Sequence, residues 1–129
     1  MTEFSLPYVS VASSGAEYFE ISFADSPDSD QAWFLIQRQF EDDDGGLFYV
    51  ESHEIRLCGH FRIRHAELKR NTLRLHIACE PAETVQITFQ AASVRYRQLK
   101  RILKIMMPAR IPIIEDDGCG EMDTRNTCP

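Results

Sequence analysis

Residues 61–79 read FRIRHAELKRNTLRLHIAC, and apolar and polar residues alternate there in two runs. In the first run Phe61 and Ile63 alternate with two arginines, and in the second run leucine, isoleucine and cysteine alternate with arginine and histidine. Successive side chains of a β-strand point to opposite faces, so both runs predict strands. A turn at residues 69–72 separates them, which predicts an antiparallel hairpin with one basic face.

Four segments outside this hairpin also predict strands. Residues 17–23 alternate cleanly, with phenylalanine and isoleucine on one side. Residues 32–38, AWFLIQR, form a short continuous apolar run, which favours a central strand covered on both faces. Residues 47–51 and 85–89 supply two further strands, so the predicted sheet extends to both sides of the hairpin.

The hydrophobic period changes near the C-terminal end of the chain. Apolar residues recur there at helical spacing, while lysine and arginine occupy the remaining faces. The apolar stripe consists of Tyr96, Leu99, Ile102, Leu103 and Met106. This pattern predicts one amphipathic helix over residues 93–107, which Pro108 and Pro112 end.

These segments predict an α+β fold, with a mainly antiparallel sheet of about seven strands and one C-terminal amphipathic helix. A chain of 129 residues fits one domain, which we place at residues 1–107. The remainder, 108–129, is acidic and contains glycine, and we expect it to form a mobile tail.

Charge is distributed unevenly along the chain, although its net value is −6. Residues 1–54 hold twelve acids and one base, residues 55–110 hold twelve bases and three acids, and residues 111–129 hold five acids and one base. Segregated charge influences partners and association rates more than the fold. Two interpretations stay open: the acids face outward towards a cationic partner, or oppositely charged strands lie side by side in one sheet and neutralise each other.

The sequence predicts a cytoplasmic protein with no membrane partner. No apolar run approaches the roughly 18 residues that a membrane helix needs, and the N-terminus lacks the basic and apolar stretches of a secretion signal. In a reducing compartment the four widely spaced cysteines are expected to be free thiols, and a bridge between Cys119 and Cys128 can form after lysis.

Patterns for catalysis and metal binding are weak in this sequence. Cys58 and His60 lie two residues apart on a predicted strand and so share a face, but no further ligands accompany them. No nucleophile elbow and no phosphate-binding glycine loop occurs. We therefore predict no enzymatic activity, no metal and no cofactor.

An acidic run, Glu41, Asp42, Asp43 and Asp44, precedes two glycines. Four adjacent carboxylates are costly to remove from water, which predicts an exposed loop. Calcium-binding loops space their ligands at alternate positions, and this run does not. The loop is either a solvated turn or an acidic patch for a basic partner.

Several short motifs follow one another in an order that is similar to a known family. Phe23-Ala24-Asp25 is followed by Trp33-Phe34-Leu35-Ile36-Gln37-Arg38, the acidic run, Tyr49-Val50-Glu51, and Gly59 ahead of the hairpin at 68–75. Over residues 21–105 this order resembles the immunity protein 10 family of bacterial polymorphic toxin systems. The resemblance implies a protein that binds a cognate toxin and protects the producing cell or its siblings. The family's motif positions fall on Gln37, Arg38, Asp43, Asp44, Tyr49 and Glu51, where the motif could equally maintain the fold.

The expected function is therefore stoichiometric inhibition of a basic toxin domain. The expected contact residues are Gln37, Arg38, Glu41, Asp42, Asp43, Asp44, Tyr49 and Glu51. Tyr49 would supply an anchor, and the carboxylates would steer a cationic partner and speed its association. The alternative is a small regulatory nucleic-acid-binding domain that uses Arg62, Arg64, Arg74 and the basic helix, although the acidic net charge disfavours nucleic acid.

Overall fold

The computed structural model describes residues 1–15, 18–27, 31–39, 47–79, 81–107 and 113–116. Within these ranges the chain forms nine strands, one α-helix and one short 3-10 turn. The strands are β1 (Thr2–Ser5), β2 (Tyr8–Ser14), β3 (Tyr18–Ala24), β4 (Trp33–Gln39), β5 (Phe48–Ser52), β6 (Gly59–Lys69), β7 (Thr72–Ala78), β8 (Glu83–Thr88) and β9 (Ile113–Asp116). The helix α1 spans Ser93–Met106, and the 3-10 turn spans Ile55–Leu57.

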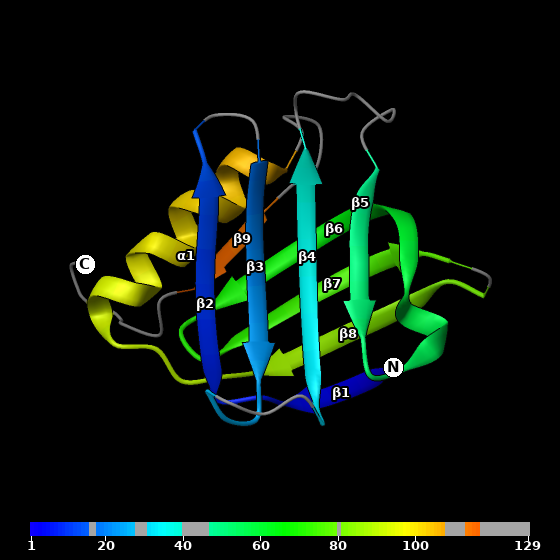
Figure 1. Cartoon of the computed structure of the whole chain (residues 1–129), viewed down its shortest axis with the longest axis horizontal. Coiled ribbons are helices and arrows are strands. Elements are labelled where there is room, and N and C mark those ends of the chain that lie inside the picture. Colours follow the sequence, from blue (N-terminus) through cyan, green and yellow to red (C-terminus); the bar gives the residue numbers. More distant parts are fainter. Residues whose placement is uncertain (16–17, 28–30, 40–46, 80, 108–112, 117–129) are drawn as a thin grey trace.

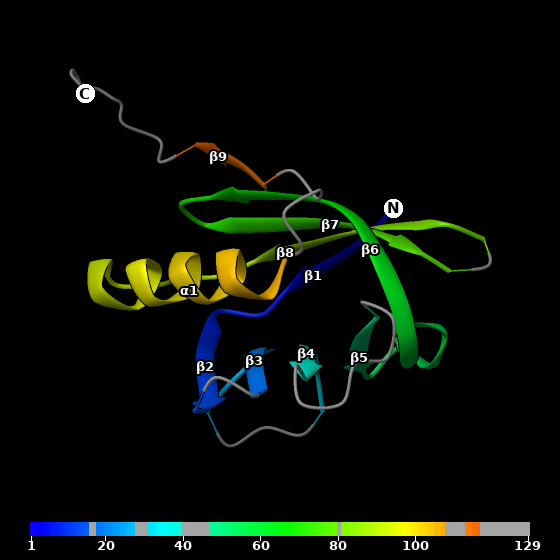
Figure 2. The ribbon, with the colours of Figure 1, turned by 90° about the horizontal axis from the view of Figure 1, so that it is seen from above.

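The strands form two layers that are joined by β6 (Figures 1 and 2). The first layer consists of β2, β3, β4 and β5, which pair antiparallel in sequence order. The second layer consists of most of β6, then β7, β8 and β1, with β1 added to β8 in the parallel direction. The first residues of β6 pair with β5, and a register shift between Ile63 and His65 interrupts its pairing with β7. Figure 2 shows β6 bending from one layer into the other.

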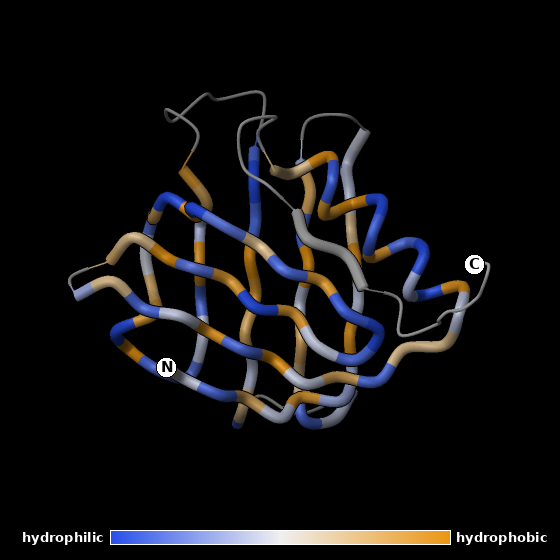
Figure 3. Tube along the Cα trace, turned by 180° about the vertical axis from the view of Figure 1, so that it is seen from behind, coloured by the Kyte–Doolittle hydropathy of each residue, from blue (hydrophilic) through white to orange (hydrophobic). Residues whose placement is uncertain are grey.

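The apolar faces of the two layers point towards each other and form the core. Phe23 of β3 lies against Phe89, which follows β8, with ring centroids 5.4 Å apart. Phe4 of β1 lies against Phe34 of β4, with centroids 5.6 Å apart. Both aromatic pairs cross from one layer to the other and add about 0.5–1.5 kcal/mol each to the free energy of area burial. Figure 3 shows hydrophobic and hydrophilic residues alternating along the strands.

Helix α1 covers the side of the core that lies opposite the bend of β6, next to β2 and β3 (Figure 2). Its buried residues are Tyr96, Leu99, Ile102, Leu103 and Met106. These are the five residues of the predicted apolar stripe, so that prediction is confirmed. In the described ranges α1 is the only α-helix, and its 14 residues fall short of the roughly 20 that a membrane-spanning helix needs.

The predicted fold class is confirmed, because the described residues form an α+β fold with a mostly antiparallel sheet and one helix that follows β8 in the chain. The antiparallel pairing of β6 with β7 also confirms the predicted hairpin. The prediction that residues 32–38 are covered on both faces is wrong: Phe34 and Ile36 of β4 are buried, whereas Trp33 and Leu35 are only half-buried. In the described part of the chain the second layer packs against one face of β4 only, which explains the difference.

Three strands, β1, β2 and β9, were not predicted from the sequence pattern. β2 is the last strand of the first layer, and only Val9 and Val11 of it are even half-buried, so its hydrophobic contrast is low. β1 and β9 have four residues each and pair in parallel with strands that are distant in sequence. β9 lies beside β6 within the segment that we expected to be a mobile tail. Residues 108–112 and 117–129 lie outside the described residues.

Replacing Phe23 with alanine should lower the free energy of unfolding by about 3–5 kcal/mol, because the change leaves a cavity between the layers and removes the contact with Phe89. Urea denaturation followed by circular dichroism measures this loss. Val94→Ala is the control, because Val94 is 60% exposed on α1 and its truncation should change the free energy of unfolding by less than about 0.5 kcal/mol. A loss for Phe23→Ala as small as that of the control would contradict the interlayer core.

Candidate functional site

The two layers separate the charges of the chain in space. The first layer comes from the acidic first half of the sequence, whereas β6, β7, β8 and α1 come from the basic second half. In the described ranges no acid of the first half forms an ion pair with a base of the second half; these acids are Glu3, Glu20, Asp25, Glu51 and Glu54. Bases on neighbouring strands therefore do not neutralise the charges of these five acids.

Three of the predicted contact residues lie together on the outer face of the first layer. Gln37 of β4 lies opposite Tyr49 of β5, and Glu51 lies opposite Leu35 in the same strand pair. Tyr49 also lies opposite His60 at the start of β6, with ring centroids 5.3 Å apart. Alternation along β4 and β5 turns these side chains away from the core, so they are available to a partner.

Strand β3 adds Tyr18 and Glu20, two residues that the sequence analysis did not select. The Tyr18 hydroxyl donates to Glu20 Oε1 at 2.5 Å, and Gln37 Nε2 donates to the same oxygen at 2.7 Å. On β5 the Tyr49 hydroxyl donates to Glu51 Oε1 at 2.8 Å. The outer face thus carries two tyrosine–glutamate pairs with Gln37 between them. We call Tyr18, Glu20, Gln37, Tyr49 and Glu51 the Tyr–Glu face.

A sequence signal for Tyr18 and Glu20 existed, because they repeat the spacing of Tyr49 and Glu51. In both pairs the glutamate follows its tyrosine by two residues on a strand and so shares its face. The missing information was the sheet order, in which β3 and β5 flank β4. That order brings the two pairs onto one surface.

The environment of both tyrosines raises the pKa of their hydroxyl groups. Burial, followed by the hydrogen bond to Glu20, raises the pKa of Tyr18 to about 12. The hydrogen bond to Glu51 is the main cause that raises the pKa of Tyr49 above its ordinary value. Both hydroxyls therefore act as donors at neutral pH. In the described part of the chain the second oxygen of neither carboxylate has a hydrogen-bond partner, so each can accept a bond from a partner protein.

Arg38 lies apart from the Tyr–Glu face, although it was predicted as a contact residue. It follows Gln37 on β4 and so points to the opposite side of the layer. There its guanidinium Nη1 donates to the carbonyl of Met106 and lies 5.4 Å from the centroid of the Phe48 ring. These contacts connect β4 to the end of α1. The other predicted contact residues, Glu41, Asp42, Asp43 and Asp44, lie outside the described residues.

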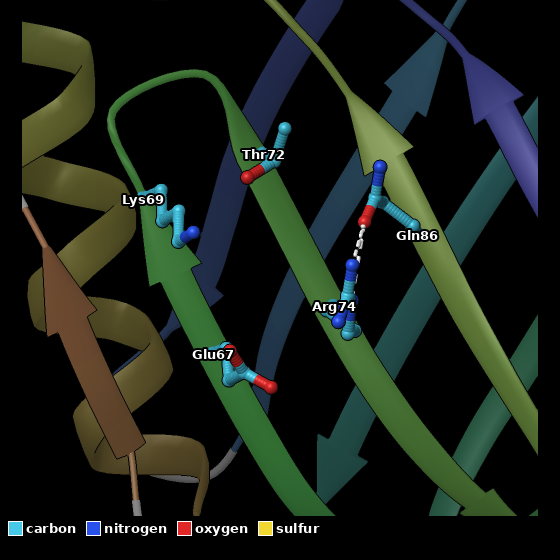
Figure 4. A pocket seen from close by; sticks show the side chains of 5 residues that line it. All are labelled: Glu67, Lys69, Thr72, Arg74 and Gln86. Atoms are coloured by element: carbon cyan, nitrogen blue, oxygen red, sulfur yellow. Dashed lines mark hydrogen bonds between the residues drawn. The ribbon is translucent and has the colours of Figure 1, made fainter.

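The three strand arginines of the nucleic-acid hypothesis lie on the second layer. Arg74 of β7 donates from Nε and Nη2 to Gln86 Oε1 on β8, at 3.1 and 2.5 Å, and Figure 4 shows this contact. Arg62 and Arg64 are exposed on β6. Arg74 is therefore held against the sheet by Gln86 and is only half-buried, whereas Arg62 and Arg64 on β6 are more exposed than Arg74.

Cys58 and His60, the pair considered as metal ligands, make separate contacts. The Cys58 thiol donates to the carbonyl of Ser52 at 3.2 Å, while His60 lies against Tyr49. Among the residues that the structure describes, neither approaches two further metal-ligating side chains. The geometry does not favour a metal at this pair.

The chain matches no protein-family model, no curated protein and no solved structure. The case for a function therefore comes from the geometry and charge of the Tyr–Glu face and from the order of the sequence motifs.

Alkaline titration tests the tyrosine–glutamate pairs. The folded state holds Tyr18 protonated up to about pH 12, whereas an unfolded chain ionises tyrosine near pH 10. This contribution to stability is therefore complete below pH 10 and is lost as the pH rises through 12. Glu20→Gln should lower the pKa of Tyr18 without returning it to the ordinary value, since burial, the larger cause, remains.

The ultraviolet absorbance of tyrosinate measures this titration. Glu51→Gln is the matched control, which should lower the pKa of Tyr49 and leave that of Tyr18 unchanged. Ionisation of Tyr18 at the ordinary tyrosine value in the unsubstituted protein would show that the pair with Glu20 does not form.

Replacing Arg38 with methionine should lower the free energy of unfolding by roughly 1.5–3 kcal/mol, because the change keeps the aliphatic volume but removes the charged donor from the Met106 carbonyl. Urea denaturation measures the loss. Gln39→Ala, an exposed neighbour on β4, should change the free energy of unfolding by less than about 0.5 kcal/mol. Equal stability of Arg38→Met and the unsubstituted protein would remove Arg38 from the contacts that hold α1.

Proposed function

We propose that this chain is an immunity protein that binds a cognate toxin domain in the cytoplasm of the producing cell and neutralises it by stoichiometric protein–protein contact. The proposed contact surface is the Tyr–Glu face, together with the acidic run 41–44 that connects β4 to β5 in sequence. One observation carries the proposal: the carboxylates of Glu20 and Glu51 face outward and, among the described residues, have no base within ion-pair distance.

The aromatic side chains of this face suit a protein interface. Tyr18 and Tyr49 are half-buried and held by hydrogen bonds to their glutamates, and Trp33 and Leu35 add half-buried apolar surface on the same side of β4. Tyrosine and tryptophan are enriched among the residues that contribute most to interface free energy. A side chain that is already fixed loses little conformational entropy on binding, which favours affinity.

The charge of the Tyr–Glu face favours a basic partner. A free carboxylate oxygen at Glu20 and another at Glu51 can accept charge-assisted hydrogen bonds from arginine or lysine of a basic protein. Complementary charge also raises association rates above the roughly 10⁵–10⁶ M⁻¹s⁻¹ of neutral pairs. Rapid capture matters for an inhibitor, because every free toxin molecule continues to act until it is bound.

The resemblance to the immunity protein 10 family supports the same surface. Gln37, Tyr49 and Glu51 occupy motif positions of that resemblance, and all three lie on the Tyr–Glu face. Arg38 occupies another motif position and contacts Met106, which suits maintenance of the fold. The motif therefore combines contact residues with at least one packing residue.

The proposal predicts a one-to-one complex with the toxin domain encoded beside the gene of this chain. Tyr49→Ala should raise the Kd of that complex at least about tenfold, because it removes an anchor and its bond to Glu51. Glu51→Lys should lower the association rate about tenfold at low salt and less at high salt, since salt screens the steering charge. Surface plasmon resonance on the co-purified partners measures both quantities.

The matched control is Glu3→Lys, the same charge reversal at an exposed acid on β1 of the second layer. It should leave the association rate within about twofold, because Glu3 lies away from the proposed surface. Equal effects of Glu3→Lys and Glu51→Lys would mean that net charge alone, and not the Tyr–Glu face, directs association. Absence of a complex with the neighbouring toxin domain would contradict the proposal itself.

A second candidate function has one observation in its favour, namely the exposure of Arg62 and Arg64 on β6. A nucleic-acid-binding domain would use these arginines with the basic face of α1. Binding to random duplex DNA or RNA that weakens steeply with salt, and that Arg64→Gln reduces, would favour this function over toxin neutralisation.

A further inference from the structure

Three side chains with metal-ligating atoms meet on the outer face of the second layer. His65 and Glu67 are two residues apart on β6, and His76 lies opposite His65 on β7. One ligand atom of each residue lies within 4.8 Å of the other two. Glu67 Oε2 is 4.0 Å from both His65 Nδ1 and His76 Nε2, and the centroids of the two imidazole rings are 4.9 Å apart.

We propose that His65, Glu67 and His76 bind a divalent transition-metal ion, with zinc as the best fit. Two imidazole nitrogens and one carboxylate oxygen form a ligand set that zinc accepts, with a fourth position left for water or another ligand. Metal–ligand distances of about 2.0–2.2 Å place neighbouring ligand atoms about 3.4 Å apart in a tetrahedral site. The observed separations, 4.0 Å for Glu67 with each histidine and at most 4.8 Å between the two histidines, exceed that spacing, so the three side chains must draw closer together when the ion binds.

The surroundings of His76 favour coordination through Nε2. Its other ring nitrogen, Nδ1, lies 3.3 Å from Thr84 Oγ1 on β8. A metal-bound histidine usually donates its second N–H to an acceptor, which fixes the ring and its tautomer. Thr84 can accept that hydrogen bond, and Nε2 is the nitrogen that faces Glu67. The hydroxyl is thus a positioning group for the site.

The carboxylate of Glu67 forms no ion pair with a lysine or arginine among the described residues. Arg74 lies opposite Glu67 in the strand register but turns to Gln86, and Figure 4 shows its guanidinium directed to β8 while Glu67 stands on β6. In the described ranges no lysine or arginine lies within ion-pair distance of Glu67; its charged partners there are the two histidines. A bound cation would therefore not have to displace an existing lysine or arginine ion pair.

Space for the fourth ligand lies beside the histidines. A pocket of about 290 Å³ has Arg64, His65, His76 and Thr84 among its lining residues. Arg64 is exposed, and solvent screens its charge, so it opposes a cation only weakly. The site lies on the opposite layer from the Tyr–Glu face, so the proposal stands independently of toxin neutralisation.

Zinc binding to the purified full chain tests the proposal, measured by competition with a chromophoric chelator. The unsubstituted protein should bind one zinc ion and show a raised melting temperature with zinc. His76→Gln and Glu67→Gln should each weaken binding at least about tenfold, and Thr84→Val about tenfold, as expected for loss of a ligand and of its hydrogen-bond partner. Arg64→Gln, which alters the same pocket without removing a ligand, should leave zinc binding equal or tighter.

Two further measurements separate this site from the cysteines and the other histidines. Bound cobalt should show no thiolate charge-transfer absorption, and zinc should shift the NMR signals of the His65 and His76 imidazoles but not those of His53 and His60. The NMR measurement uses the unsubstituted protein and so does not depend on whether a variant folds. Failure to bind zinc, an unchanged affinity in His76→Gln, or shifts confined to His53 and His60 would overturn the proposal.

Discussion

Each of the two layers has a single apolar face, and these faces leave water only by packing against each other. That requirement determines the course of β6, which pairs with β5 at its start, shifts register between Ile63 and His65, and then pairs with β7. Aromatic contacts such as Phe23 with Phe89 join the layers at the centre. The helix α1 covers the remaining side with its five buried residues.

This packing places the acidic and basic segments of the sequence on different parts of the molecule. Strands β2 to β5 come from the acidic first half of the chain and form the first layer, whereas the arginines of the second half lie on other elements. On the outer face of the first layer Glu20 and Glu51 therefore lie beside tyrosines and not beside arginines. The two outer faces consequently differ in chemistry. One presents paired tyrosines and glutamates, and the other presents His65, Glu67 and His76 between strands.

Local pattern predicted the elements whose partners are near in sequence. The β6–β7 hairpin and the stripe of α1 follow from period alone, whereas β1 and β9 depend on parallel pairing with distant strands that no local pattern records. For the candidate site, alternation along the strand predicted that Tyr49 and Glu51 share one face. The same rule could have shown that Arg38 and Gln37 point to different faces of the layer. Tyr18 and Glu20 required the sheet order. His65 and His76 required a register shift that periodicity cannot locate.

The central claim is that a basic toxin domain binds the outer face of the first layer. The most direct measurement is amide hydrogen exchange of the chain with and without the proposed toxin domain. The account predicts slower exchange at β3, β4 and β5 in the complex, with β7 and β8 unchanged. Protection confined to β7, β8 and the outer face of β6 would contradict it.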